Sequence, residues 1–174
     1  MKKLNKNNKG FSLVELLVVI AIMVVLVGVL APTLLGNIEK SRVSSDIQTL
    51  DSVASAIQNT LATESAYAVA TKATGGYTQP TKVSAVVKDT VDETSDNAFI
   101  VVLHEYLAKM PSLKGSTAVI DNLYFAVNAT NGQVTVWVFD GTGTATLPAS
   151  NATASGAAVT GVLRAKNTNY VVIR

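Results

Sequence analysis

Three residues near the N-terminus have types and a spacing that chemistry could use: Gly10, Phe11 and Glu15. Glu15 lies close to the start of an apolar run, and no other charged side chain occurs between Leu16 and Ile38. A carboxylate at the centre of a lipid-spanning helix costs ~2.5–3.5 kcal/mol, and less near the helix end. Glu15 therefore either reaches the membrane surface or finds a positive partner. Gly10 has no side chain, so an enzyme could approach its backbone closely. Alternatively, Gly10 is only a spacer.

Few other residues offer chemistry. The chain of 174 residues has no cysteine, which excludes disulfides, thiolate nucleophiles and cysteine-bound zinc. Its single histidine, His104, lies off the apolar stripe of its segment and beside Glu105, so we expect it at the surface. Asp89, Asp92 and Glu93 form an acidic cluster without a ligand spacing, which favours a solvated face over a metal site. We predict no metal, no cofactor and no enzymatic activity.

The basic residues are unevenly distributed. Four lysines precede the apolar run, so 10 of the 14 basic side chains remain against 12 acidic ones in the rest of the chain. The resulting net charge of −2 disfavours nucleic-acid binding. The leading lysines favour a cytoplasmic N-terminus, with the residues after Ile38 outside. A cleaved secretory signal is the alternative, but the apolar run exceeds the usual ~7–15 residues and lacks a cleavage site of the A-x-A type.

A single long helix is expected from Phe11 to about Thr63. The part up to Ile38 is apolar on every side and, at about 1.5 Å per residue, can cross a hydrocarbon core of ~30 Å. In the second part, apolar side chains recur every three or four positions, which predicts an amphipathic helix. The apolar positions are Val43, Ile47, Leu50, Ala54, Ile57 and Leu61, and the wet face is Glu39, Lys40, Arg42, Ser44, Asp46, Gln48 and Asp51. Gly28 and Pro32 predict a kink or a locally melted turn.

The segment after the long helix is less regular. Residues 64–94 are expected to form a long loop, with one short strand or helical turn around Lys82–Lys88. The next segment, Ser95–Met110, has the spacing of a second helix, with Ser95 or Asp96 as its N-cap.

An antiparallel sheet is expected from about residue 117 to 174. Alternating runs at Leu123–Val127 and Val134–Phe139 flank an Asn-Gly turn, which predicts a β-hairpin. Two further strands are expected at about Ala158–Arg164 and Asn169–Ile173. The predicted fold class is α+β: a long N-terminal helical spine packs against the C-terminal antiparallel sheet, with a second short helix in the connecting region.

The run Lys9-Gly10-Phe11-Ser12-Leu13-Val14-Glu15-Leu16 resembles the start of type IV pilins, of the type IVa-like kind, and of their pseudopilin relatives. The shared signature is a short basic leader, a glycine, a phenylalanine, a glutamate four residues later and an apolar helix. The resemblance covers roughly residues 1–60. The chain lacks the cysteine pair that closes the C-terminal loop in many of these proteins, as do cysteine-free members among Gram-positive pilins.

The resemblance implies a maturation route. A prepilin peptidase would cut between Gly10 and Phe11 and then N-methylate Phe11. An assembly ATPase and a membrane platform protein would move subunits from the cell membrane into an extracellular helical homopolymer. The implied parts are a leader at 1–10, a transmembrane and polymerisation helix at 11–38, its amphipathic continuation at 39–63 and a globular head at 64–174.

The apolar run supports this route independently. Its Leu, Ile and Val side chains, 16 between Phe11 and Leu35, would forfeit about 25–50 kcal/mol in water at ~1.5–3 kcal/mol each. The segment can therefore leave lipid only for another apolar place, such as a bundle of its own copies. The new amine at Phe11 could then pair with Glu15 of a neighbour and fix the axial register.

Three functions remain open at this point. A structural pilus subunit serving adhesion, surface motility or biofilm formation is favoured. A pseudopilin of a type II secretion or competence (DNA-uptake) machine would share residues 1–60. Secretion pseudopilins often carry calcium in a C-terminal loop, and the candidate loop here holds only Asp140. An anchored enzyme has the least support, because nothing places catalytic side chains together.

Overall fold

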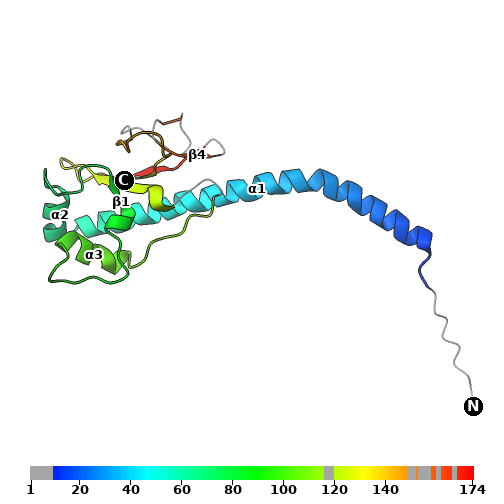
Figure 1. The fold of residues 1–174 in the computed structure, drawn as a ribbon, viewed down its shortest axis with the longest axis horizontal. Helices are drawn as coiled ribbons and strands as arrows, with labels where there is room; N and C mark the ends of the chain where they lie inside the picture. The colour runs from blue at the N-terminus through cyan, green and yellow to red at the C-terminus, as the bar shows by residue number, and fades with distance from the viewer. Residues whose placement is uncertain (1–9, 116–119, 149–151, 153–157, 160–161, 166–167) are drawn as a thin grey trace, which may run out of the picture. The chain divides into compact units, whose positions relative to one another are not determined.

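The structure is a computed structural model that describes residues 10–115, 120–148, 152, 158–159, 162–165 and 168–174. The chain divides into two compact units, Met1–Ile38 and Glu39–Arg174, and we call the second one the globular unit. Figure 1 traces the ribbon and labels the three α-helices of the described residues and strands β1 and β4. Helix α1, Leu13–Leu61, has residues in both units. The long helix and the antiparallel sheet confirm the predicted α+β class.

Helix α1 is 49 residues long and lies within the span expected from Phe11 to Thr63. It contains a stretch of mean hydropathy 3.2, none of it buried, that by length and composition can cross a membrane. Valine and isoleucine weaken a helix in water, but lipid leaves the backbone no other way to pair its polar groups. The helix runs without a break through Gly28 and Pro32. Pro32 has no N–H to donate to the carbonyl of Gly28, and the kink expected there stays a prediction.

The second part of α1 buries one face in the core, as its spacing predicts. Val43, Leu50, Ala54 and Ile57 are buried, and Ile47 and Leu61 are partly buried against the same core. The expectation that Asp46 lies on the wet face is wrong, because this residue is fully buried. Asp46 lies three positions after Val43 and four before Leu50, so it shares their face of the helix.

A short helix, α2 (Glu64–Ala70), lies in the segment that was expected to be a loop. It buries Ala66 and Ala70, one turn apart, and small alanine side chains do not make a visible apolar pattern. The chain then passes very close to the end of α2 at Gly76. A Cβ added to Gly76 would lie 2.4 Å from the carbonyl oxygen of Lys72 and 2.8 Å from that of Ala70. Only glycine fits here, since both obstacles are backbone atoms.

We expect Gly76→Ala to lower the free energy of unfolding of the globular unit by roughly 1–3 kcal/mol or more, because backbone atoms cannot move aside cheaply. Trp137, the only tryptophan and fully buried, reports the transition by fluorescence during thermal unfolding of the full chain in detergent. Gly75→Ala is the control: its Cβ meets nothing within 4 Å, and its cost comes only from a φ of +75°. Equal losses in both variants would contradict the steric explanation.

Helix α3 (Ala98–Tyr106) is shorter than the expected Ser95–Met110. Asn97 caps it, since its Oδ1 accepts a hydrogen bond from a first-turn backbone N–H at 3.0 Å. The expectation that Ser95 or Asp96 forms the cap is wrong. The carboxylate of Asp96 instead accepts hydrogen bonds from donors in the preceding loop.

The main sheet has four antiparallel strands in the order β1-β2-β3-β6. Strands β2 (Leu123–Val127) and β3 (Val134–Val138) form the expected hairpin. Its turn ends at Gly132, whose φ of +69° favours glycine. Strand β1 (Thr81–Lys82) and the turn of 3-10 helix η1 (Val83–Ala85) agree with the short strand or helical turn expected in this region.

The C-terminal strands differ from expectation. Only β6 (Val171–Ile173) joins the main sheet, next to β3. Strands β4 (Arg164–Ala165) and β5 (Thr168–Asn169) form a separate two-stranded pair. Within the range 158–164, where one strand is expected, the described residues make an isolated bridge at Val162, and Arg164 begins β4. Residues 160–161 lie outside the described residues, as do parts of the loop before them.

Both faces of the main sheet are covered. The core that α1 and α3 share contains every second residue of β3: Val134, Val136 and Val138. Trp137 points to the opposite face and is fully buried in a second cluster, to which the C-terminal segment contributes Val162. The alternation of the strand predicts this division.

Candidate functional site: the start of helix α1

The residues with predicted chemistry lie together at the start of α1. Gly10, Phe11 and Ser12 precede the helix, and Ser12 occupies its N-cap position. The backbone N–H of Ser12 donates to Glu15 Oε2 at 2.9 Å, and the N–H of Val14 donates to Ser12 Oγ at 3.4 Å. We call this reciprocal pair a capping box, although the N-cap hydroxyl accepts from the second helical residue and not from Glu15, the third; the pair satisfies orphan donors of the first turn.

The capping box gives Glu15 a partner within its own chain. The carboxylate is the third helical residue, close to the positive end of the helix dipole, where a negative charge is favoured. From the sequence, Glu15 is expected either to reach the membrane surface or to find a positive partner, and a partner within its own chain is not expected. The spacing Ser-x-x-Glu ahead of an apolar run is the signal that identifies this box, and it is present from Ser12 to Glu15.

The helix beyond this box presents an uncovered apolar surface. The side chain of Phe11 is 92% exposed, and every large apolar side chain from there to Ile38 is exposed. Contiguous apolar surface of this extent marks contact with lipid or with another protein. A Cβ built at Gly10 or Gly28 meets nothing within 4 Å.

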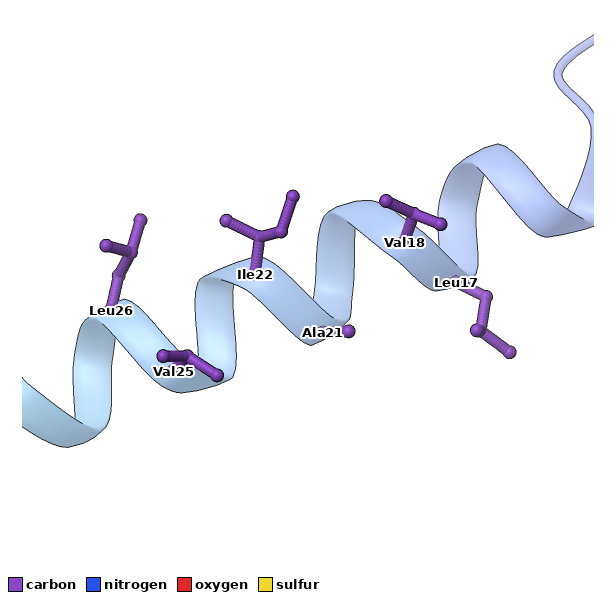
Figure 2. A pocket seen from close by; sticks show the side chains of 6 residues that line it. All are labelled: Leu17, Val18, Ala21, Ile22, Val25 and Leu26. Atoms are coloured by element: carbon purple, nitrogen blue, oxygen red, sulfur yellow. The ribbon is translucent and has the colours of Figure 1, made fainter.

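A shallow groove runs along this surface between two rows of side chains, and Figure 2 shows both rows. Members of each row are four positions apart, which is the ridge spacing that lets another helix pack into the groove. Ala21 has the smallest side chain among them. The lining residues are Leu17, Val18, Ala21, Ile22, Val25 and Leu26.

The globular unit holds the other polar residues that were considered. His104 is half-buried, and its Nδ1 lies 3.0 Å from the carbonyl oxygen of Lys88. Asp92 is exposed, and hydrogen bonds from Thr94 and Ser95 lower the pKa of its carboxyl. Among the residues that the structure describes, no group of three or more His, Asp and Glu side chains could hold a metal ion.

Comparison with known protein families gives a match over the same residues at the start of α1. Residues 5–31 match the family described as the prokaryotic N-terminal methylation motif. Neither the curated proteins nor the solved structures gave a match. The matched family consists of structural subunits rather than enzymes, and its motif implies processing by a prepilin peptidase and assembly into filaments.

The matched range contains the capping box and the first part of the uncovered apolar helix. The motif indicates a pilin-like or pseudopilin-like protein. Residues 5–31 are thus the N-terminal signal of a type IV pilin-like prepilin, in a chain without cysteine.

Proposed function

We propose that the chain is the structural subunit of an extracellular type IV pilus. It polymerises through the first part of α1 into a helical homopolymer that serves adhesion, surface motility or biofilm formation. One combination supports this most: the methylation motif at residues 5–31 includes the start of an apolar helical surface that the described chain does not cover. That surface requires lipid before assembly and other copies of the chain afterwards.

Maturation on this proposal starts with removal of residues 1–10. The prepilin peptidase cuts between Gly10 and Phe11, and Phe11 becomes the N-methylated terminus. The assembly ATPase and the membrane platform protein then transfer the subunit from the cell membrane to the growing fibre. Residues 11–38 form the membrane and polymerisation helix, 39–63 its amphipathic continuation and 64–174 the head.

Glu15 directs this transfer by exchanging partners. In the single chain its carboxylate accepts a hydrogen bond from a neutral donor, the backbone N–H of Ser12. A neighbour's ammonium group at Phe11 is a stronger partner, because it carries a full positive charge whereas the backbone N–H is only a dipole, and the attraction between two full charges is large in an apolar surrounding. The pairing neutralises two charges that would each be costly among apolar side chains, and it sets the axial position of each subunit.

The groove of Figure 2 suits the same assembly. A row of side chains from a second copy of α1, spaced by four residues, fits between the two rows that line it. Close packing of this kind replaces the lipid contacts that each subunit loses on leaving the membrane.

A pseudopilin of a secretion or DNA-uptake machine has the same motif and remains the alternative outcome. The loop considered for calcium gives it no support. The carboxylate of Asp140 accepts hydrogen bonds from the backbone N–H and the hydroxyl of Thr142, at 2.9 and 2.6 Å.

Electron microscopy of cells with and without the gene tests the proposal, together with mass spectrometry of the sheared fibres. We expect fibres that disappear on deletion and whose subunit begins with a methylated Phe11. Cells that lack surface fibres but lose secretion or DNA uptake on deletion would favour the pseudopilin. A native protein that keeps residues 1–10 would contradict the processing step.

A further inference from the structure

Asp46 is a fully buried carboxylate of α1 in the globular unit. Its Oδ1 accepts the backbone N–H of Lys114 at 2.6 Å, and its Oδ2 accepts that of Gly115 at 2.7 Å. The hydroxyl of Tyr170, another fully buried residue, lies 3.4 Å from the same Oδ2. One side chain of α1 thus contacts both the loop 111–115 and the residue that immediately precedes β6.

Asp51 holds the other end of the same strand. Arg174 donates from Nε and Nη2 to the two carboxylate oxygens of Asp51, at 2.8 and 2.7 Å, in a bidentate pair. The hydrogen bond from Arg174 lowers the pKa of Asp51. The backbone of Arg174 also exchanges two hydrogen bonds with Val134 of β3, with N···O distances of 2.8 and 2.6 Å.

These contacts add to the burial of Tyr170 and Val171, and they matter because the segments they hold are short. Strand β6 has three residues, and the loop 111–115 has no helix or strand. No disulfide is possible, since the chain has no cysteine. A short strand with few ladder hydrogen bonds detaches easily unless side chains hold it.

We propose that Asp46 and Asp51 form a latch that closes the loop 111–115 and strand β6 onto α1 as one cooperative unit. The unit opens before the β2–β3 hairpin and its core unfold. Opening frees the edge of β3, which then becomes a template for pairing with another chain. The latch stands independently of the proposed pilus function.

Native-state hydrogen exchange on the full chain in detergent tests the latch. In the natural chain, the amides of Lys114, Gly115 and β6 should share one opening reaction that is faster than that of the β2–β3 amides. In Asp46→Asn, the new amide NH₂ faces one of the two backbone donors, so one of the two bonds is lost and the other is no longer charge-assisted. Exchange at these amides should rise about ten- to hundredfold, with the hairpin unchanged.

Asp140→Asn is the matched control, because Asp140 is exposed and accepts its hydrogen bonds within its own turn. We expect it to leave exchange in the loop and in β6 unchanged. A uniform rise over all amides in Asp46→Asn, or a rise confined to Lys114 and Gly115, would overturn the latch. If Asp46→Asn does not fold, exchange in the natural chain still tests the latch. Different opening rates for the loop 111–115 and for β6 in the natural chain would contradict the latch.

Discussion

Glu15→Val is expected to abolish or cripple fibre assembly, while the precursor still inserts into the membrane. Valine removes a charge that costs up to ~2.5–3.5 kcal/mol in lipid, so insertion is kept or improved. The same change leaves the neighbour's amine at Phe11 without an anion inside an apolar bundle. Membrane fractionation measures insertion, and electron microscopy of cells that express only the variant measures assembly.

Two further variants separate the charge of Glu15 from its capping role. Glutamine at this position can still accept the N–H of Ser12, so Glu15→Gln keeps the capping box but loses the anion. We expect Glu15→Gln to assemble as poorly as Glu15→Val. Ser12→Ala keeps the anion and should assemble, at a cost of ~0.5–2 kcal/mol in helix stability. Normal fibres from Glu15→Gln would contradict the charge-pairing role.

Gly10→Val is expected to leave the precursor uncleaved in the membrane. A branched side chain next to the bond before Phe11 blocks close approach by the peptidase. The chain itself has room for that side chain, since a Cβ at Gly10 meets no atom within 4 Å. A block would therefore report on the enzyme and not on the fold of the substrate. The intact mass of the membrane-extracted protein shows whether residues 1–10 are retained.

Gly36→Val serves as the control for that experiment. Gly36 also faces open space, but it lies far along the helix from the bond to be cut. The Gly36→Val precursor should be cleaved like the natural chain. A mature N-terminus at Phe11 in Gly10→Val would remove the peptidase assignment, whatever the fate of the fibre.

Periodic patterns predicted the elements in which many side chains repeat the same preference. The apolar run and the three-and-four spacing after it determine α1 to within two residues at each end. The alternation on both sides of the Asn-Gly turn determines the β2–β3 hairpin and which face Trp137 occupies. In these elements local preference and burial agree over many positions.

Other features depend on partners that are distant in sequence. The sequence predicts an exposed Asp46 because carboxylates usually are exposed. Its burial is compensated by the backbone N–H groups of Lys114 and Gly115 and by the hydroxyl of Tyr170. Strand β1 is two residues long and exists because β2 lies beside it. Helix α2 packs through alanines, whose small side chains carry almost no periodic signal.

In the candidate site, too, the local features can be predicted from the sequence and the distant partner cannot. Sequence alone identifies Gly10, Phe11 and Glu15, because the motif is local and contiguous. The hydrogen bond between Ser12 and Glu15 is equally local, and the Ser-x-x-Glu spacing predicts it once the start of the helix is known. The partner of Glu15 in a fibre belongs to a different chain, so its identity stays a proposal.

The place where α1 begins has a consequence for proteolysis. Gly10 and Phe11 lie before the helix, Ser12 caps it by accepting the N–H of Leu16 at 3.2 Å, and the first helical residue is Leu13. A peptidase must draw out the backbone on either side of the bond it hydrolyses. Because the bond between Gly10 and Phe11 lies outside the helix, an enzyme can bind it without unwinding a single turn. If residues 1–10 are removed as proposed, the apolar helix can therefore stay fully formed during the cut.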